Sequence, residues 1–295
     1  MKAFIRLRRA LFGAGLAAGV ALLVGAGCSK TASPPSAAVA AGPKLYILDC
    51  GTIVPMDSKL FSLNPGEFKG DGGFVSPCYL IVHPKGTLVW DLGQIPDKDI
   101  PDNGTVVEQS VFKASRKLGS QLQALGHPAK DITFVAMSHY HADHTANANM
   151  FAASTWIVQQ AEYDMMFSKA EIGIRDPGSY KDLENAKRIT LQNADHDVFG
   201  DGTVIIKTAP GHTPGHQMVF LRLAHFGPLL LAGDLYHFPE EKTLDRVPTF
   251  DFDAAMTRET RKKTDAFLAQ TGATMWIQHD PPTNAKLKKA PEHYD

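Results

Sequence analysis

Short apolar runs alternate with loops rich in glycine and proline along most of this chain. The runs predict strands at residues 44–49, 78–82, 87–90, 132–137, 156–158, 204–207, 218–223, 229–232 and 274–277. Helical spacing of the apolar positions predicts helices at 106–125, 161–167 and 253–270. Hairpins and strand–helix units are mixed, so the sequence favours an α/β fold with mixed sheets over a purely parallel doubly wound sheet.

The first 28 residues have the pattern of an export signal. Basic residues come first, and an apolar run follows from Ala10 to Ala26, which is short for a membrane span. Cys28 follows Val24-Gly25-Ala26-Gly27, which resembles a bacterial lipoprotein box, whereas Ala38-Val39-Ala40 offers a site for ordinary signal cleavage. We therefore expect an exported protein, periplasmic or tethered to the envelope through a lipidated Cys28, with a retained membrane anchor as the alternative.

The chain thus divides into three predicted parts. An export or lipoprotein signal occupies residues 1–28, and a linker of small residues and proline occupies 29–43. The remainder, 44–295, is long enough for one large folded domain. The formal net charge is −1 and no basic stripe is visible, so the sequence predicts no nucleic-acid partner.

Two cysteines remain after Cys28, and each lies at the edge of an apolar run. Cys50 and Cys78 could pair in an oxidising compartment. Because free cysteine is commonly a buried apolar residue, we expect two unpaired buried thiols.

The candidate chemistry centres on the run His139-Tyr140-His141-Ala142-Asp143-His144, which directly follows a predicted strand. The chain has 12 histidines among 295 residues, so three within six positions argue against a chance cluster on a solvated turn. Imidazole nitrogen and carboxylate oxygen are ligands that zinc and similar metals bind. Alternation in an irregular turn lets His139 and His141 face one ion while Asp143 and His144 face a second.

Three further ligand candidates follow later strands or turns. His216 ends the turn Gly211-His212-Thr213-Pro214-Gly215, Asp234 follows Gly233, and His279 follows Gln278. A carboxylate has two oxygens, so Asp234 could bridge two cations. Two adjacent cations polarise a carbonyl or phosphoryl oxygen and make water nucleophilic without a serine or cysteine.

These motifs, in this order, resemble the metallo-β-lactamase superfamily over roughly residues 44–283. The resemblance implies a metallo-hydrolase domain with an αβ/βα sandwich of two mixed sheets flanked by helices. It also implies two divalent metal ions, for which we expect zinc. The first ion is then held by His139, His141 and His216, and the second by Asp143, His144 and His279, with Asp234 as the bridge. Asp91, at the end of a strand, resembles the family's buried aspartate that braces the site.

Within the superfamily, the closest resemblance is to the N-acyl-homoserine lactonases. Asp143 and His144 together differ from the second-metal ligands of true β-lactamases. The segments that carry the likeness are Leu45-Tyr46-Ile47-Leu48, Pro77-Cys78-Tyr79-Leu80 and Phe250-Asp251-Phe252-Asp253. The short segment after His279 leaves little room for the helical domain of the glyoxalase II branch.

One position departs from the lactonase pattern. Those enzymes carry a tyrosine three positions after the bridging aspartate, where its phenol contacts the substrate carbonyl, but this chain has His237 there and Tyr236 beside it. Either residue could take that catalytic role, or neither. His212 we interpret as a structural or bracing residue. The aromatic side chains of Phe74, Phe238 and Phe250 are candidates for an acyl-binding groove, and a loop or core role for each is the alternative.

The resemblance implies an enzyme that hydrolyses lactone rings, with N-acyl-homoserine lactones (quorum quenching) as the expected substrates. Asp143 would pass a proton to the leaving alkoxide as well as bind metal. Another ester class on the same fold, such as a phosphotriester, a thioester or a β-lactam, is the alternative. A non-enzymatic envelope lipoprotein that binds or stores metal is a third hypothesis. The glycine-rich loop at 52–77 is a candidate contact for a homodimer.

Overall fold

The computed structural model describes residues 42–170 and 174–295. The predicted signal at 1–28, Cys28 and the linker up to residue 41 lie outside these residues. Among the helices that the structure describes, none combines the length and the apolar character needed to cross a membrane.

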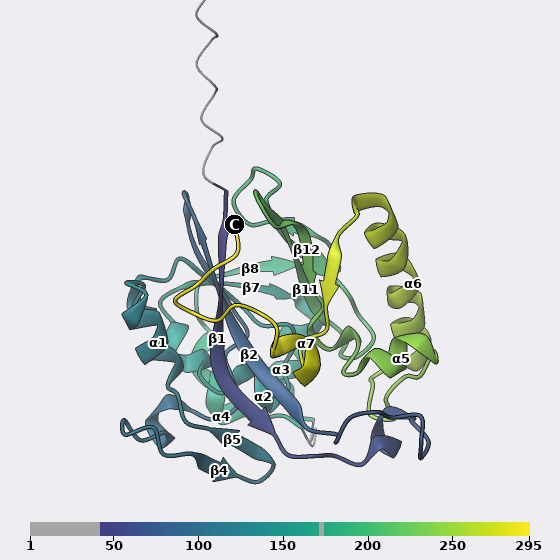
Figure 1. Cartoon of the computed structure of the whole chain (residues 1–295). Helices are drawn as coiled ribbons and strands as arrows, with labels where there is room; N and C mark the ends of the chain where they lie inside the picture. The colour runs from purple at the N-terminus through teal and green to yellow at the C-terminus, as the bar shows by residue number, and fades with distance from the viewer. Residues whose placement is uncertain (1–41, 171–173) are drawn as a thin grey trace, which may run out of the picture. The chain divides into compact units, whose positions relative to one another are not determined.

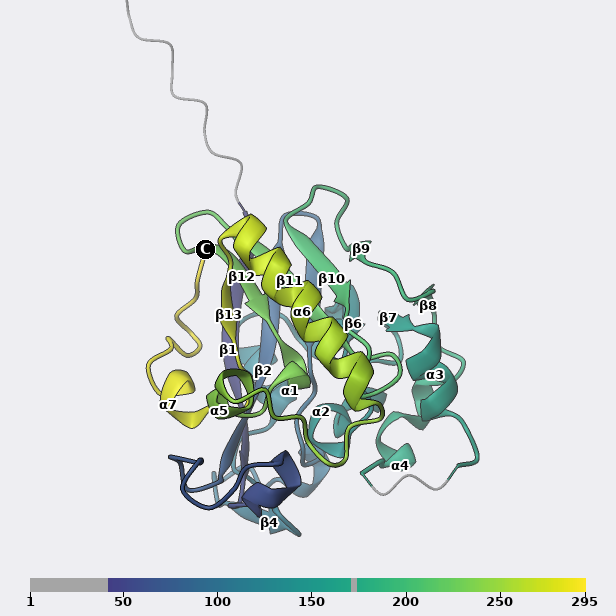
Figure 2. The ribbon, with the colours of Figure 1, turned by 90° about the vertical axis from the view of Figure 1, so that its right-hand side faces the viewer.

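In the described part of the chain, two mixed β-sheets pack face to face, and helices cover their outer faces (Figures 1 and 2). The larger sheet has the strand order β4-β5-β1-β2-β3-β6-β7-β8, and the smaller sheet has the order β13-β12-β11-β10-β9. The predicted αβ/βα sandwich is therefore confirmed. The strands of the larger sheet are β1 Lys44–Ile53, β2 Phe74–His83, β3 Gly86–Trp90, β4 Val107–Gln109, β5 Phe112–Ala114, β6 Phe134–Ala136, β7 Thr155–Gln159 and β8 Arg188–Leu191. Those of the smaller sheet are β9 His196–Asp197, β10 Val204–Thr208, β11 Gln217–Leu223, β12 Gly227–Leu231 and β13 Thr274–Trp276.

Both sheets combine antiparallel hairpins with parallel neighbours. Strands β1, β2 and β3 pair antiparallel, whereas β3, β6, β7 and β8 run parallel. In the smaller sheet, β10, β11 and β12 are antiparallel and β13 runs parallel to β12. The parallel strands β3 and β6, and likewise β12 and β13, end at the same edge, where loops can bring polar side chains together.

Strand β1 shows how the sequence builds two apolar layers. Its side chains alternate between faces, so Leu45 and Ile47 enter the core between the sheets. Leu48 and Cys50 enter a second apolar cluster under the helices of the larger sheet. All four are buried, which explains why this strand reads as a continuous apolar run.

The helices pack on the outer faces of the sheets. Figure 2 shows α6 lying across β10, β11 and β12, where Phe267 and Leu268 pack against the smaller sheet. The Asp253 carboxylate caps α6 by accepting the backbone N–H groups of Ala255 and Met256, as expected for a helix start. The α-helices are α1 Leu118–Ala124, α2 Ala142–Thr145, α3 Gln160–Met166, α4 Pro177–Tyr180, α5 Pro239–Thr243, α6 Ala254–Thr271 and α7 Pro281–Asn284.

The helix predicted at 106–125 is wrong in its first half. That half forms the β4–β5 hairpin, with Ser110 in the left-handed region at φ 56°, and only α1 is helical. The segment begins with Val106, Val107, Val111 and Phe112, and β-branched and aromatic side chains favour strands. Their spacing imitates a helical face, which is why periodicity alone misassigned them.

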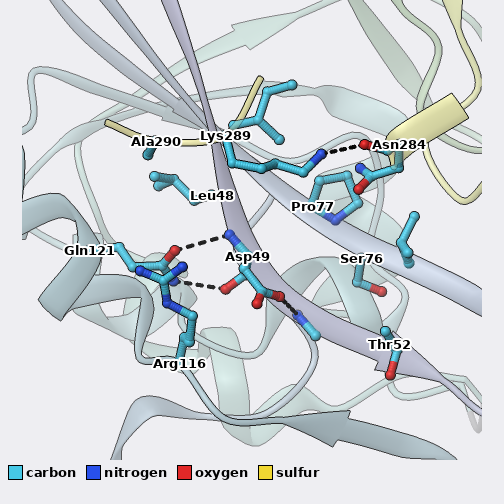
Figure 3. Close-up of a pocket in the computed structure, with 13 residues that line it drawn as sticks. Leu48, Asp49, Thr52, Ser76, Pro77, Arg116, Gln121, Asn284, Lys289 and Ala290 are labelled. Carbon is cyan, nitrogen blue, oxygen red and sulfur yellow. Dashed lines mark hydrogen bonds between the residues drawn. The ribbon is translucent and has the colours of Figure 1, made fainter. Parts of the chain in front are cut away.

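Helix α1 is fixed to β1 by one side-chain amide. Gln121 Nε2 donates to the carbonyl oxygen of Asp49 at 2.7 Å, and Gln121 Oε1 accepts the Asp49 N–H at 3.0 Å (Figure 3). This occurs where the pairing of β1 with β2 becomes irregular, so the amide satisfies backbone groups that the sheet leaves open. The hollow beside it, of about 240 Å³, is lined by Arg116 and Lys289 among others and contains no residue of the metal-binding groups described below.

Cys50 and Cys78 form a disulfide between β1 and β2, with their Cα atoms 5.8 Å apart. The prediction of two unpaired thiols was therefore wrong. Leu48 is the direct partner of Cys78 in the antiparallel pair. Cys50 lies two residues further along on the same face, so the two sulfur atoms become diagonal neighbours.

Removing the disulfide is expected to lower the free energy of unfolding by about 3 kcal/mol, because the bond closes a loop across a sequence separation of 28 residues. Thermal unfolding with and without reductant measures the effect. The variant with Cys50→Ala and Cys78→Ala is the control, since reductant should not change its unfolding temperature. An equal response of variant and parent to reductant would contradict the prediction.

Candidate metal centre

Residues that directly follow β6, β12 and β13 meet at one edge of the sandwich. The run from His139 to His144 follows β6 of the larger sheet, whereas Asp234 and His279 follow strands of the smaller sheet. Because these strands end at the same edge, side chains 135 positions apart in sequence come within contact distance, as between His144 Nε2 and His279 Nε2 at 3.3 Å.

The first donor group consists of His139, His141, His212 and Asp234, each offering one ligand atom within 4.8 Å of the others. His212 Nε2 lies 3.2 Å from His139 Nε2 and 3.1 Å from His141 Nδ1. All four residues are buried. Lone pairs of converging neutral imidazoles repel one another unless a proton or a cation lies between them, so this arrangement fits a metal ion.

The second donor group consists of Asp143, His144, Asp234 and His279. Asp143 Oδ2 lies 3.3 Å from His144 Nε2 and 3.5 Å from His279 Nε2. The other nitrogen of His279, Nδ1, donates to the backbone carbonyl of Val75 at 2.8 Å, which leaves Nε2 directed at the group. Two carboxylates and two imidazoles again form a donor set suited to a divalent cation.

Asp234 belongs to both groups, one oxygen to each. Its Oδ1 lies 3.0 Å from His279 Nε2 and 3.3 Å from His144 Nε2. Its Oδ2 lies 3.6 Å from both His139 Nε2 and His212 Nε2. Oδ1 is buried and has no hydrogen-bond partner, which is a costly state for a carboxylate oxygen. A pair of cations bridged by Asp234 would satisfy both oxygens.

The protonation preferences of these residues agree with metal binding. Burial, together with the neighbouring imidazoles, lowers the pKa of His139 and His141 well below the usual range and keeps them neutral. Burial opposes ionisation of Asp143 and Asp234, but the surrounding imidazoles outweigh it and hold the pKa of both carboxyls low. Burial likewise opposes a charged His144, yet the carboxylates around it raise its pKa. This carboxylate-rich side of the centre therefore attracts positive charge.

The structure brings six of the seven predicted ligands together and corrects the seventh. His212, not His216, completes the first group. Both ring nitrogens of His216 have backbone partners: Nδ1 donates to the Ala209 carbonyl and Nε2 accepts the Asp234 N–H, each at 3.0 Å. His216 therefore positions the backbone of the bridging residue, which is the bracing role that the sequence predicts for His212.

Of the two candidates for the substrate contact, the structure places only His237 at the centre. Its Nε2 lies 3.2 Å from Asp234 Oδ2. Tyr236 has extended backbone angles, so its ring points away from its neighbour's and packs under the guanidinium of Arg261, 4.1 Å from the ring centroid. The prediction of a catalytic Tyr236 is therefore corrected, because its phenol does not border the centre.

Buried carboxylates and amides brace the ligands. Asp91 acts as predicted: it accepts the Ser138 N–H at 2.6 Å and a Gln278 amide hydrogen at 2.7 Å, and it lies 3.1 Å from His144 Nδ1. The sequence reasoning missed Asp251, whose carboxylate accepts from His212 Nδ1 at 2.8 Å and so directs Nε2 at the first group. The usable signal was the acidic residue flanked by apolar Phe250 and Phe252.

Glu162, at the start of α3, was also missed. Its carboxylate accepts the Tyr140 N–H at 2.7 Å, the Thr213 hydroxyl at 2.7 Å and the Gly215 N–H at 2.9 Å. It therefore ties the loop that carries His139–His144 to the turn that carries His212. Gly215 has no room for a side chain, because a Cβ there would lie 2.4 Å from the Glu162 backbone nitrogen.

Glu162 is expected to make stability depend on pH. Burial raises its pKa from 4.5 to about 7. Its contribution to folding is thus fully present below pH about 4.5 and is lost as the pH rises through about 7. The stability advantage of the parent over Glu162→Gln should therefore shrink by up to about 3 kcal/mol between pH 5 and 8. Urea unfolding of both proteins measures this difference, and a constant difference over that range would refute it.

A cavity of about 240 Å³ opens beside the two donor groups. His141, Asp143, Asp234 and His237 line it on one side. Its remaining lining is apolar and comes mostly from the loop after β1 and from the β4–β5 hairpin: Ile53, Met56, Leu60, Phe61, Phe74, Val111, Phe112, Ile174 and Phe250. Phe74 and Phe250 thus lie where an acyl-binding groove was predicted, whereas Phe238 packs behind them.

An αβ/βα sandwich with two His/Asp donor groups joined by one aspartate defines the class of hydrolases with a two-metal centre on the metallo-β-lactamase fold. Comparison with known proteins agrees. Residues 71–272 match the family model described as the metallo-beta-lactamase superfamily. The N-acyl homoserine lactonase AttM of Azorhizobium caulinodans is 31% identical over 265 residues, 85% of this chain and 98% of the relative. AttM of Agrobacterium fabrum is 32% identical over the same coverage. The chain belongs to the metallo-beta-lactamase superfamily and, within it, to the family of N-acyl homoserine lactonases.

Solved structures support the fold. One is an N-acyl homoserine lactone hydrolase with the product N-hexanoyl-L-homoserine bound at its catalytic metal centre, with a TM-score of 0.71 at 23% identity over 86% of this chain and 99% of that one. Another is AidC, a dizinc quorum-quenching lactonase in complex with a product, with a TM-score of 0.59 at 19% identity over 86% of this chain and 94% of that one.

Proposed function

We propose that this chain opens the lactone ring of N-acyl homoserine lactones by metal-dependent hydrolysis, the quorum-quenching reaction. The observation that carries the proposal is the cavity, in which an apolar wall adjoins both donor groups. A homoserine lactone with an acyl chain combines a polar ring with an apolar tail, so the ring would face the donor groups and the tail the phenylalanines. The identity to curated lactonases along nearly their whole length supports the same substrate class.

The residues divide the chemistry among them. When bound, the cations supply Lewis acidity at the ester carbonyl and make water nucleophilic near neutral pH. His139, His141 and His212 would hold one ion, and His144, His279 and Asp143 the other, with Asp234 shared. Asp143 lines the cavity and keeps an ionised carboxylate, so its Oδ2 can take the proton that the attacking water loses and then pass it to the alkoxide released when the ring C–O bond breaks.

We propose zinc as the resident ion of both groups. Imidazole nitrogen with carboxylate oxygen is a donor set that zinc binds well, although iron, cobalt and manganese use the same atoms. Metal analysis of purified protein tests this proposal. We expect close to two zinc ions per chain, and a different dominant metal would replace zinc in the proposal.

A substrate panel on metal-quantified protein tests the activity. We expect kcat/KM on N-acyl homoserine lactones to exceed that on phosphotriesters, thioesters and β-lactams. Lactone turnover far below any of these would overturn the proposed substrate class. Two bound ions without hydrolysis of any of the four classes would favour a metal-binding lipoprotein instead.

We further propose that the protein is exported and tethered to the envelope through Cys28. The disulfide between Cys50 and Cys78 supports an oxidising compartment, since such bonds are rare in the cytosol. Cell fractionation of the parent and of Cys28→Ala tests the tether: the parent should be in the membrane fraction and the variant in the soluble periplasm. Dimerisation through the segment 52–77, which includes the loop between β1 and β2, also stays a proposal, which the mass of the purified protein in solution tests.

A further inference from the structure

His237 differs from the other side chains that line the cavity beside the donor groups. Among the described residues that line it, His237 is the one polar side chain that belongs to neither donor group. Its ring lies 5.1 Å from the ring of His212 and 6.0 Å from that of His279, so it stands beside both groups. A polar atom of a substrate that extends beyond the two donor groups would meet this imidazole.

The Glu241 carboxylate binds the His237 ring at Nδ1, the nitrogen on the side away from Asp234. Its Oε1 accepts from His237 Nδ1 at 3.2 Å and from the backbone N–H groups of His237 and Phe238 at 3.1 and 3.3 Å. Glu241 is completely buried. Because Nδ1 is committed to this carboxylate, Nε2 is the nitrogen left to face Asp234 and the cavity.

Arg261, in the middle of α6, fixes Glu241 in turn. Its Nη2 donates to Glu241 Oε2 at 2.9 Å, and its Nε donates to the Leu235 carbonyl at 2.9 Å. Its Nη1 donates to the Arg246 carbonyl. The buried guanidinium therefore connects both ends of the segment 235–246 to α6, because it donates to the carbonyl groups of Leu235 and Arg246.

A buried ion pair such as Arg261–Glu241 contributes little net free energy to folding. Desolvating two charges costs as much as their attraction returns, and apolar side chains of similar volume serve a core equally well. What the pair does provide is a fixed orientation for one ring beside the centre. Preorganised donors near a reacting carbonyl are among the largest contributors to catalysis.

We infer that Glu241 and Arg261 are positioning residues that hold His237 with Nε2 toward the cavity. Carboxylates lie 3.2 Å from both ring nitrogens, so both nitrogens carry a proton: Nδ1–H donates to Glu241, and Nε2–H donates a hydrogen bond to the carbonyl oxygen of the scissile ester. The inference rests on the proposed function for the identity of that ester. It makes His237 a substrate-contacting residue whose action depends on a carboxylate outside the metal ligands.

A double-mutant cycle on zinc-loaded protein tests the inference. His237→Phe keeps an aromatic ring but removes the donor, and should lower kcat on the order of 100-fold with two ions still bound. Glu241→Gln should lower kcat roughly 10-fold in the parent but less than about 2-fold in the His237→Phe background, because it acts through that ring. Glu240→Gln, the same change on the same helix, should leave kcat within about 2-fold of the parent.

Effects that multiply to about 1000-fold in the double variant would show that Glu241 supports the fold rather than His237, and an unchanged kcat for His237→Phe would remove the substrate contact. If Glu241→Gln does not fold, Arg261→Lys replaces it in the cycle with the same expectation. Nuclear magnetic resonance of metal-free protein labelled at the histidine nitrogens gives a substrate-independent readout. The Nδ1–H signal of His237 should shift in Glu241→Gln, and an unshifted signal would refute the brace.

The cycle is run on whichever ester of the substrate panel is hydrolysed fastest. Failure of the lactone assignment thus leaves the test of His237 and Glu241 intact.

Discussion

Replacing Asp234 with asparagine is expected to abolish tight binding of the metal pair and to lower kcat/KM by at least about 1000-fold. The two oxygens of Asp234 face different donor groups, at 3.0 Å from His279 Nε2 and 3.6 Å from His139 Nε2. An amide has one acceptor oxygen, and its NH₂ group would face imidazole nitrogens or a cation. No other side chain takes part in both groups of the described centre.

Metal content per chain and kcat/KM, measured on the same preparation, decide this prediction. Asp131→Asn is the matched control, because it makes the same chemical change at an exposed position remote from the donor groups. A variant at Asp234 that retained two ions and full activity would disprove the bridging role and the two-metal assignment with it.

The second prediction with a large effect is that substitutions of His212 and His216, two histidines of one turn, have different consequences. His212→Ala is expected to lose one ion and to lower kcat/KM by roughly 100- to 1000-fold, because His212 Nε2 converges with His139 and His141. His216→Gln is expected to keep both ions and to lose about 1–2 kcal/mol of stability, because its hydrogen bonds to backbone groups weaken.

Metal analysis and thermal unfolding of both variants provide the comparison. Loss of an ion from His216→Gln together with retention of both by His212→Ala would restore the ligand set that the sequence suggested and would contradict the observed geometry.

The strands and most donor residues were predictable because their signals are local. An apolar run followed within a few residues by histidine or aspartate indicates both a buried strand and a polar side chain beyond its end. Examples are β6 before His139 and β13 before His279. Choosing between His212 and His216 needs tertiary information. Both lie in the same glycine- and proline-rich turn, and only the position of the Asp234 backbone shows that His216 is already satisfied.

The bracing carboxylates were hidden for a related reason. Along the chain, Glu162 and Glu241 look like ordinary acidic residues at helix starts, where solvent exposure is the usual state. Their burial follows from which loops pack onto those helices. The disulfide was missed likewise, because the register of β1 against β2 depends on pairing across the sheet.

The disulfide also shapes how this enzyme can change over evolutionary time. Cys50 and Cys78 close a covalent ring that contains Ile53, Met56, Leu60, Phe61 and Phe74, five of the apolar side chains around the cavity, and none of the donor residues. Substitutions inside the ring can reshape the wall that selects a substrate, while the ligands stay on other segments. Acyl preference and metal chemistry can therefore vary independently, and a protease cut inside the ring would still leave both ends joined.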